Sequence, residues 1–157
     1  MYRTFKAVRL FLAGLCLVAL NTQAQMATSP FGFPLTSLNL GNQTVDIEVA
    51  DTASNRQQGL MYRKKLDGDA GMLFIFPDSK KQCMWMRNTE LALSVAFIDA
   101  HYRIINLADM QPLDDTEHCS TRPARFALEM NQGWFVKHGI KAGSRLPSLE
   151  KLGRRPI

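Results

Sequence analysis

Apolar and polar positions alternate along much of the chain, and this pattern predicts mostly β-strands. Segment 44–50 places three apolar side chains on one face and two acids on the other, which is the period of a half-buried strand. Segment 72–76 is an unbroken apolar run of strand length, typical of a strand buried on both faces. The remaining predicted strands are 35–40, 83–86, 91–99, 103–110, 125–130 and 143–146.

Two segments carry the signals of short helices. Asp51 or Thr52 can cap a helix over 53–62, and Asn131 can cap a second over 132–138. Short strands in the majority with two short helices predict a mainly β, small single domain, an antiparallel β sandwich or barrel. An α+β arrangement is the alternative.

The first residues predict a signal for secretion. Residues 1–9 carry three cations and no acid, and 10–20 is an apolar run, shorter than the roughly 20 residues that cross a bilayer. Small and polar residues follow, up to a plausible cut after Ala24. We therefore expect a signal peptide over 1–24, a periplasmic or secreted protein, and no stable membrane span after cleavage. A signal segment kept as an anchor is the alternative.

The rest of the chain predicts one domain. Residues 25–34 are rich in proline and small residues and suggest a flexible lead-in; 35–146 form the single β-rich domain, and 147–157 suggest a loose tail. The formal net charge of +5 includes the three cations of the signal, and the other cations are scattered. Since no basic stripe with interleaved aromatics is present, we expect no nucleic-acid partner.

Two cysteines, Cys83 and Cys119, lie beyond the signal. An even count in an oxidising compartment predicts a disulfide, with two free thiols as the alternative. Copper held by Cys83, Met84 and Met86 is a weaker hypothesis, because both methionines point away from Cys83 in a strand. With no recognised metal, phosphate or dinucleotide motif, we expect neither a metal nor a cofactor.

Four short motifs occur in a distinctive order. They are GLMYR at 59–63, GMLF at 71–74, WMRNT at 85–89 and LEMNQGW at 128–134. In this order and spacing the chain resembles the family called domain of unknown function 192, over roughly 38–146. The resemblance implies a small β-rich, jelly-roll-like fold and export, but no activity. Members commonly have a proline where this chain has Glu90–Leu93.

One candidate binding cluster follows the strand at 83–86. Trp85, Arg87, Asn88 and Thr89 combine an aromatic wall with a guanidinium and an amide, which suits a small polar, anionic or sugar-like ligand. The alternative is a core tryptophan followed by a polar turn that satisfies local backbone groups.

A second cluster comprises Arg63, Glu129 and Asn131. Glu129 interrupts an otherwise apolar strand, so we expect it to be half-buried and paired with an arginine as a structural ion pair. The alternative is a general base with a raised pKa, with Arg63 or Arg87 stabilising charge.

Three functions remain open from the sequence. The first is an exported accessory or binding domain that holds a small polar or anionic ligand or an envelope partner. The second is an envelope saccharide or peptide hydrolase or lyase that uses Glu129. The third is a structural or interaction protein. No catalytic motif decides whether the chain is an enzyme.

Overall fold

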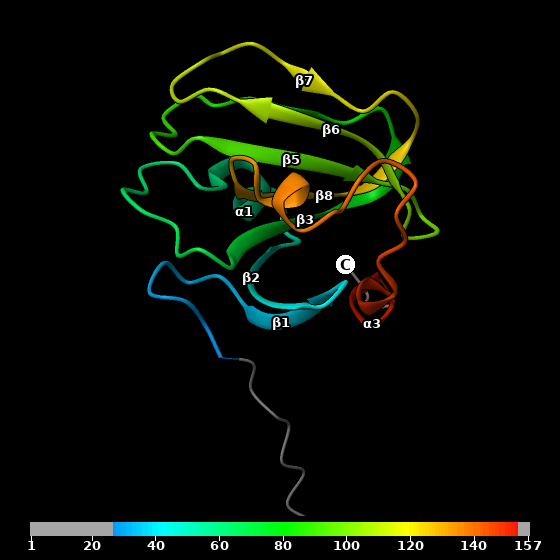
Figure 1. Ribbon diagram of the computed structural model, residues 1–157. Helices are drawn as coiled ribbons and strands as arrows, with labels where there is room; N and C mark the ends of the chain where they lie inside the picture. The colour runs from blue at the N-terminus through cyan, green and yellow to red at the C-terminus, as the bar shows by residue number, and fades with distance from the viewer. Residues whose placement is uncertain (1–26, 154–157) are drawn as a thin grey trace, which may run out of the picture.

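A computed structural model describes residues 27–153 (Figure 1). The predicted signal at 1–24 and the last four residues of the predicted tail lie outside this range. The strands are β1 Leu35–Leu40, β2 Gln43–Ala50, β3 Ala70–Lys80, β4 Cys83–Met84, β5 Leu93–Ile98, β6 Ile104–Met110, β7 His118–Cys119 and β8 Ala124–Asn131. The helices are α1 Ala53–Gln58, α2 Trp134–Lys137, the short 3-10 helix η1 Pro147–Leu149 and α3 Glu150–Gly153.

Six strands form one sheet in the order β1-β2-β3-β8-β5-β6, and β4 pairs with β7 in a separate two-stranded sheet. The predicted mainly β fold is therefore confirmed. The large sheet is mixed rather than purely antiparallel, because β2 and β3 run parallel while its other neighbouring strands are antiparallel. The chain leaves β2, passes through α1 and returns beside β2 in the same direction, as a parallel pair requires.

The sheet has apolar side chains on both faces, and each face is covered by different segments. On the first face, side chains such as Leu128 and Met130 pack with residues of α2 and the C-terminal helices. On the second face, side chains such as Phe74 and Val95 pack under Leu60. Both faces of β5, β8 and residues 71–75 of β3 are therefore buried, which matches the apolar run at 72–76.

One glycine is fixed by the close approach of β3 to β8. Gly71 lies opposite Met130, and a Cβ added to Gly71 would overlap the Met130 sulfur and the carbonyl oxygen of Glu129. Any side chain at Gly71 would push β8 away from β3 at the row next to Glu129.

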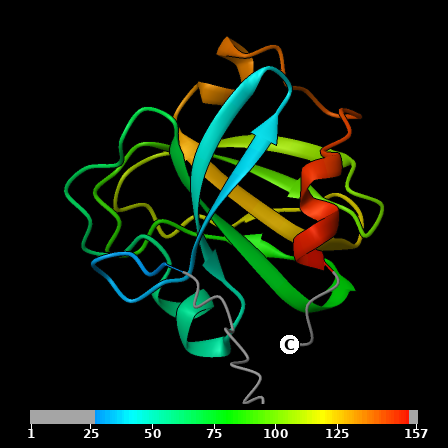
Figure 2. The same ribbon diagram turned by 90° about the horizontal axis from the view of Figure 1, so that it is seen from below.

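Both ends of the described chain are packed, which differs from the flexible lead-in and the loose tail expected for 25–34 and 147–157. Phe33 is buried, and Thr28 forms an isolated bridge with Pro34. At the other end Leu149 and Leu152 are buried, and Figure 2 shows α3 lying against the sheet. The physical reason is the same at both ends: a few apolar side chains complete the core and fix short polar segments.

The helices are shorter than predicted. Thr52 caps α1 as expected, since its hydroxyl accepts a 3.1 Å hydrogen bond from the Asn55 amide, but Gly59 ends the helix with a φ of 50°. Asn131 does not cap α2, because it ends β8 and Gly133 is the residue before the helix. The predicted last strand at 143–146 reduces to one bridge between Arg103 and Arg145. Within residues 27–153 no helix is long and apolar enough to span a bilayer.

Candidate functional site

Glu129 is a fully buried acid in the middle of the sheet. It lies on β8 between Met72 of β3 and Val95 of β5, and only 3% of it is exposed. No hydrogen bond or ion pair joins its carboxyl group to another residue in the described part of the chain. Burial raises the pKa of Glu129 to about 8, because the ionised form loses its hydration without gaining a partner.

Glu129 lines a pocket on the second face, which we name the Glu129 pocket. Its volume is about 120 Å³. The walls come from α1 and the residues after it, from β3, and from the segment around β4. Beside Glu129, the lining residues are Arg56, Gln57, Gln58, Gly59, Leu60, Met61, Phe74, Phe76, Cys83, Met84, Trp85 and Thr89. A buried carboxyl therefore faces a small pocket that has both apolar and polar side chains in its walls and that a small group can enter.

The first wall is set by α1. Thr52 begins the helix and Gly59 ends it, so the chain turns and buries Leu60 against the second face. Arg56 also lines the pocket, but its guanidinium Nη1 donates to the backbone carbonyls of Asp51 and Ile75. The charge of Arg56 is thus directed towards the backbone, and it does not pair with Glu129.

The second wall is held by the Cys83–Cys119 disulfide, so the predicted disulfide is confirmed. The bond joins β4 to β7, and the Asn106 side chain donates a 3.1 Å hydrogen bond to the Cys119 carbonyl from β6. Cys83 and Met84 line the pocket directly. A covalent cross-link therefore fixes the strand that leads into Trp85.

Trp85 lies at the outer edge of the pocket, with 42% of its surface exposed. The Arg87 guanidinium lies 4.1 Å from the centroid of the Trp85 ring and pairs with Asp115 through bonds of 3.0 and 3.2 Å. The hydrogen bond and charge of Asp115 raise the pKa of Arg87 above its usual value. Trp85 is thus an exposed, stacked aromatic surface and not the core tryptophan of the alternative interpretation.

Asn88 and Thr89 form the turn after Trp85. Asn88 has a φ of 56°, in the left-handed region that asparagine tolerates, and its carbonyl accepts a 2.8 Å hydrogen bond from the Tyr62 amide. This bond ties the turn to the segment after α1. Thr89 is buried, lines the pocket, and donates from its hydroxyl to the Arg87 carbonyl at 3.3 Å. Asn88 positions the turn, whereas Thr89 contributes to the pocket wall.

Arg63 does not pair with Glu129, so the expected ion pair between these residues is wrong. The Arg63 guanidinium forms two hydrogen bonds with the Glu48 carboxylate, at 2.9 and 2.8 Å, and lies 3.3 Å from the ring centroid of Phe31. Glu48 lies on β2, two strands from Glu129 in the sheet. The predicted half-burial of Glu129 is also wrong, since β3 and β5 cover it on both sides.

Asn131 is placed away from the Glu129 pocket. Its side-chain amide donates to the carbonyl of Asp67 at 2.9 Å and lies within hydrogen-bonding distance of the Leu66 and Gly68 carbonyls. It therefore holds the turn before β3. The structure brings Trp85, Thr89 and Glu129 to one pocket, with Arg87 stacked beside it, and places Arg63 and Asn131 elsewhere.

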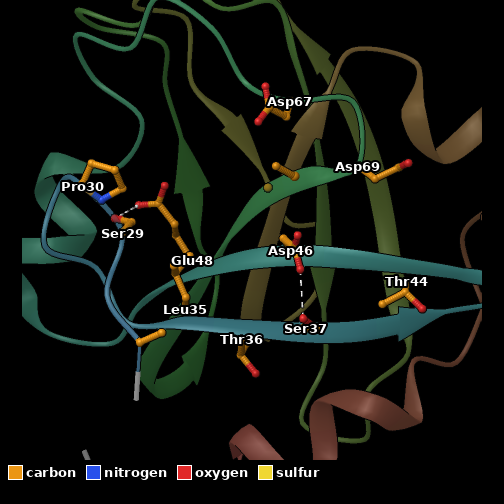
Figure 3. A pocket seen from close by; sticks show the side chains of 13 residues that line it. Ser29, Pro30, Leu35, Thr36, Ser37, Thr44, Asp46, Glu48, Asp67 and Asp69 are labelled. Atoms are coloured by element: carbon orange, nitrogen blue, oxygen red, sulfur yellow. Dashed lines mark hydrogen bonds between the residues drawn. The ribbon is translucent and has the colours of Figure 1, made fainter. Parts of the chain in front are cut away.

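A second, larger cavity of about 600 Å³ lies along β1, β2 and the start of β3, and Figure 3 shows its acidic lining. Each of its buried or bordering acids already has a partner. Glu48 accepts from Ser29 and Arg63, Asp46 accepts from Ser37, and Asp69 accepts from the Trp134 indole. Asp67 pairs with Lys65. This cavity therefore differs from the Glu129 pocket, whose acid is unpaired.

Metal-ligating groups gather at one place in residues 27–153. Cys83, Glu117 and Cys119 lie close enough together to share an ion. Two of these three residues form the disulfide, so their sulfur atoms are not available as thiolate ligands.

The sequence interpretation did not identify the wall supplied by α1 or the aromatic side chains of β3. Phe74 and Phe76 were assigned only to a buried strand, and 56–58 only to a helix. The available signal was the GLMYR motif, which begins at Gly59 where this wall turns towards the sheet.

The model of the family DUF192, described as an uncharacterised ACR, matches residues 36–148. The chain belongs to the DUF192 family. The resemblance drawn from the four motifs is thereby confirmed, and no curated protein matches the chain.

Two solved structures resemble this DUF192 chain. One, from Sinorhizobium meliloti 1021, is described as a "putative transcription regulator"; it is 32% identical, with a TM-score of 0.64 over 71% of this chain and 88% of its own. The other, a protein of unknown function from Novosphingobium aromaticivorans DSM 12444, is 29% identical, with a TM-score of 0.70 over 78% and 92%. The family and these structures establish no specific function.

Proposed function

We propose that this DUF192 chain is an exported binding domain whose Glu129 pocket holds one polar group of a small ligand or of an envelope partner. The observation that supports the proposal is the unpaired carboxyl of Glu129 in a pocket. An isolated buried carboxyl is costly unless it gains a hydrogen bond or counter-charge. A ligand that supplies a hydrogen bond or counter-charge would offset the cost of burying Glu129.

The pocket volume limits what can enter. Ligand sites for drug-sized molecules usually span about 300–1,000 Å³, whereas the Glu129 pocket has about 120 Å³. One group of a larger ligand therefore fits inside, and the remainder would lie over the exposed Trp85 ring. Of the polar and anionic ligands expected from the sequence, a buried acid disfavours an anion inside the pocket. A polar group remains.

Export enters the proposal through residues 1–24. The mature chain is then expected to begin at Gln25, and mass spectrometry of the exported fraction measures this directly. A chain that keeps residues 1–24 in that fraction would contradict cleavage. We propose no nucleic-acid partner and do not extend the transcription-related name of the Sinorhizobium protein to this chain, because its cations are scattered.

Native and denatured masses of the purified mature protein test ligand binding. We expect extra mass in the native spectrum of the wild type and of Tyr62→Ala, and none for Trp85→Ala. Tyr62 is a suitable control, because it is an exposed aromatic that does not line the pocket. Extra mass that persists in Trp85→Ala would place the ligand elsewhere, and equal masses in all three would contradict a retained ligand.

The raised pKa of Glu129 favours a second function, acid–base catalysis on an envelope saccharide or peptide. A carboxyl with a pKa of about 8 is protonated at neutral pH and can donate a proton to a leaving group. Arg87 stacks on Trp85 beside the pocket and is paired with Asp115, whereas Arg63 is paired with Glu48. A hydrolase or lyase of this kind would lose turnover in Glu129→Gln while still binding substrate. Unchanged turnover in Glu129→Gln would exclude this catalytic function.

A further inference from the structure

We infer that the Glu129 pocket selects a positively charged group, the ammonium end of an amine carried on a short unbranched carbon chain. The inference rests on the proposed binding function and names the chemical class of the ligand. It follows from the shape of the pocket, the charges that face it and the aromatic side chains in its walls.

The pocket combines a buried acid with several apolar side chains. Glu129, Leu60 and Phe74 are almost completely buried and form the deep part, whereas Trp85 is exposed at the outer edge. Met84 and Phe76 complete the sides. A ligand that matches this arrangement has an apolar stem along the walls and a polar end at the carboxyl group.

The charge at the deep end has to come from the ligand. On the neighbouring strands, Met72 and Val95 flank Glu129 and carry no charge. Of the other lining residues, Arg56 alone is charged; its guanidinium donates to two backbone carbonyls, and Cys83 is held in the disulfide. A ligand ammonium would be the missing counter-ion of Glu129, and such a charge-assisted hydrogen bond is stronger than one to a neutral hydroxyl.

The aromatic side chains favour the same choice. Phe74, Phe76 and Trp85 line the space that leads to Glu129. Aromatic faces attract cations, and the attraction increases when water is excluded. An anion would be repelled by the carboxylate and would gain nothing from the ring faces. An uncharged group would gain one hydrogen bond from the protonated acid.

Binding of an ammonium group should release a proton. With a pKa of about 8, Glu129 is mostly protonated at pH 7, whereas an ammonium pairs with the carboxylate. The complex therefore has a lower Glu129 pKa than the free protein. By linkage, close to one proton leaves on binding at pH 7, and affinity rises from pH 6 to pH 9, up to the pH at which the amine itself loses its proton.

Three probes of equal length test the inference: n-butylammonium, n-butanol and butyrate. Binding is followed by NMR of carboxyl-labelled glutamate, and proton release by calorimetry in two buffers of different ionisation enthalpy. We expect butylammonium to bind about tenfold or more tightly than butanol, with proton release, and butyrate not to bind. Glu129→Gln should abolish the preference, whereas Glu90→Gln, at an exposed acid paired with Lys64, should keep it.

Equal affinity for butanol and butylammonium, preferred binding of butyrate, or a preference that survives in Glu129→Gln would each overturn the inference. Absence of binding by all three probes would also overturn it. These failures are distinct from failure of the proposed function, which is judged by the retained ligand mass and its loss in Trp85→Ala. A retained neutral or anionic ligand would leave the binding function intact and reject the ammonium.

Discussion

Two carboxyl groups in the same row of the sheet have opposite environments. Glu48 of β2 lies in register with Met72 of β3, which in turn lies in register with Glu129 of β8. Glu48 receives two hydrogen bonds from Arg63 and one from Ser29. Glu129 receives none within residues 27–153. The first acid is part of a completed structural pair, whereas the second has no partner and lies in the deep part of a pocket.

The two acids therefore suit different roles: Glu48 stabilises the fold, and Glu129 is the candidate for ligand binding. A buried charge with all its partners holds segments together, and removal of one partner is strongly destabilising. A buried acid without partners does not hold segments of the fold together. Its carboxyl group is available to a ligand. The following variants test this contrast, from the largest expected effect to the smallest.

The pH dependence of stability should show Glu129 most clearly. The pKa of Glu129 rises from 4.5 to about 8 on folding, so the folded state binds the extra proton between these values. Stability is therefore full below about pH 4.5, falls as pH rises and levels off above about pH 8. The loss should be about 5 kcal/mol, measured by urea unfolding at several pH values. Glu129→Gln should flatten this profile, and Glu90→Gln should not. An unchanged profile in Glu129→Gln would contradict the raised pKa.

Arg63→Met should leave Glu48 buried without its counter-charge. We expect the free energy of unfolding at pH 7 to fall by about 3 kcal/mol, since one partner of a buried pair is lost. The double variant Arg63→Met and Glu48→Gln should recover much of this loss. Urea unfolding measures both, and retained ligand mass in these variants would confirm that the pair is separate from the pocket. A loss of binding with full stability would reverse that conclusion.

Asn131→Ala tests whether a residue chosen from the sequence as a ligand contact is structural. Its amide donates to the carbonyl of Asp67 and lies within hydrogen-bonding distance of the Leu66 and Gly68 carbonyls in the same turn. We expect a loss of about 1 kcal/mol, the usual contribution of a partly exposed hydrogen bond. Thermal unfolding and ligand mass are the measurements. Reduced binding without reduced stability would assign Asn131 to the site.

Trp85→Ala should have the smallest effect on folding, because much of the ring is exposed and its neighbour Arg87 is held by Asp115. The urea midpoint should stay close to that of the wild type while ligand binding is lost. Asn88→Ala is a useful comparison. Asn88 adopts a left-handed backbone conformation, so its replacement by alanine should lower stability. If Trp85→Ala loses binding only in proportion to stability, the distinctive residues serve the fold alone.

The fold was largely predictable from local pattern. The alternation in β2 and the apolar run in β3 identified both strands. The spacing of apolar side chains along a strand shows whether one face or both faces of that strand are buried. The parallel pairing of β2 with β3 was not predictable in this way. It depends on α1 carrying the chain across the sheet, and neither strand pattern encodes the direction of its neighbour.

The site was predictable only in part. Glu129 was identifiable because an acid between Leu128 and Met130 breaks an apolar strand. Its lack of a partner was not, since the sequence pattern does not reveal that Arg63 pairs with Glu48. The pocket itself joins residues from 56 to 129, and which of them meet is decided by packing over the second face.

The Cys83–Cys119 bond makes one wall of the pocket depend on the oxidation state of the chain. Cys83 lines the pocket, and the bond ties β4 to β7 at the wall that precedes Trp85. In a reducing compartment the two cysteines would stay as thiols, and β4 and β7 would lack this covalent link. If the chain is exported as proposed, oxidation of the two cysteines would be a maturation step that completes this wall of the pocket after export.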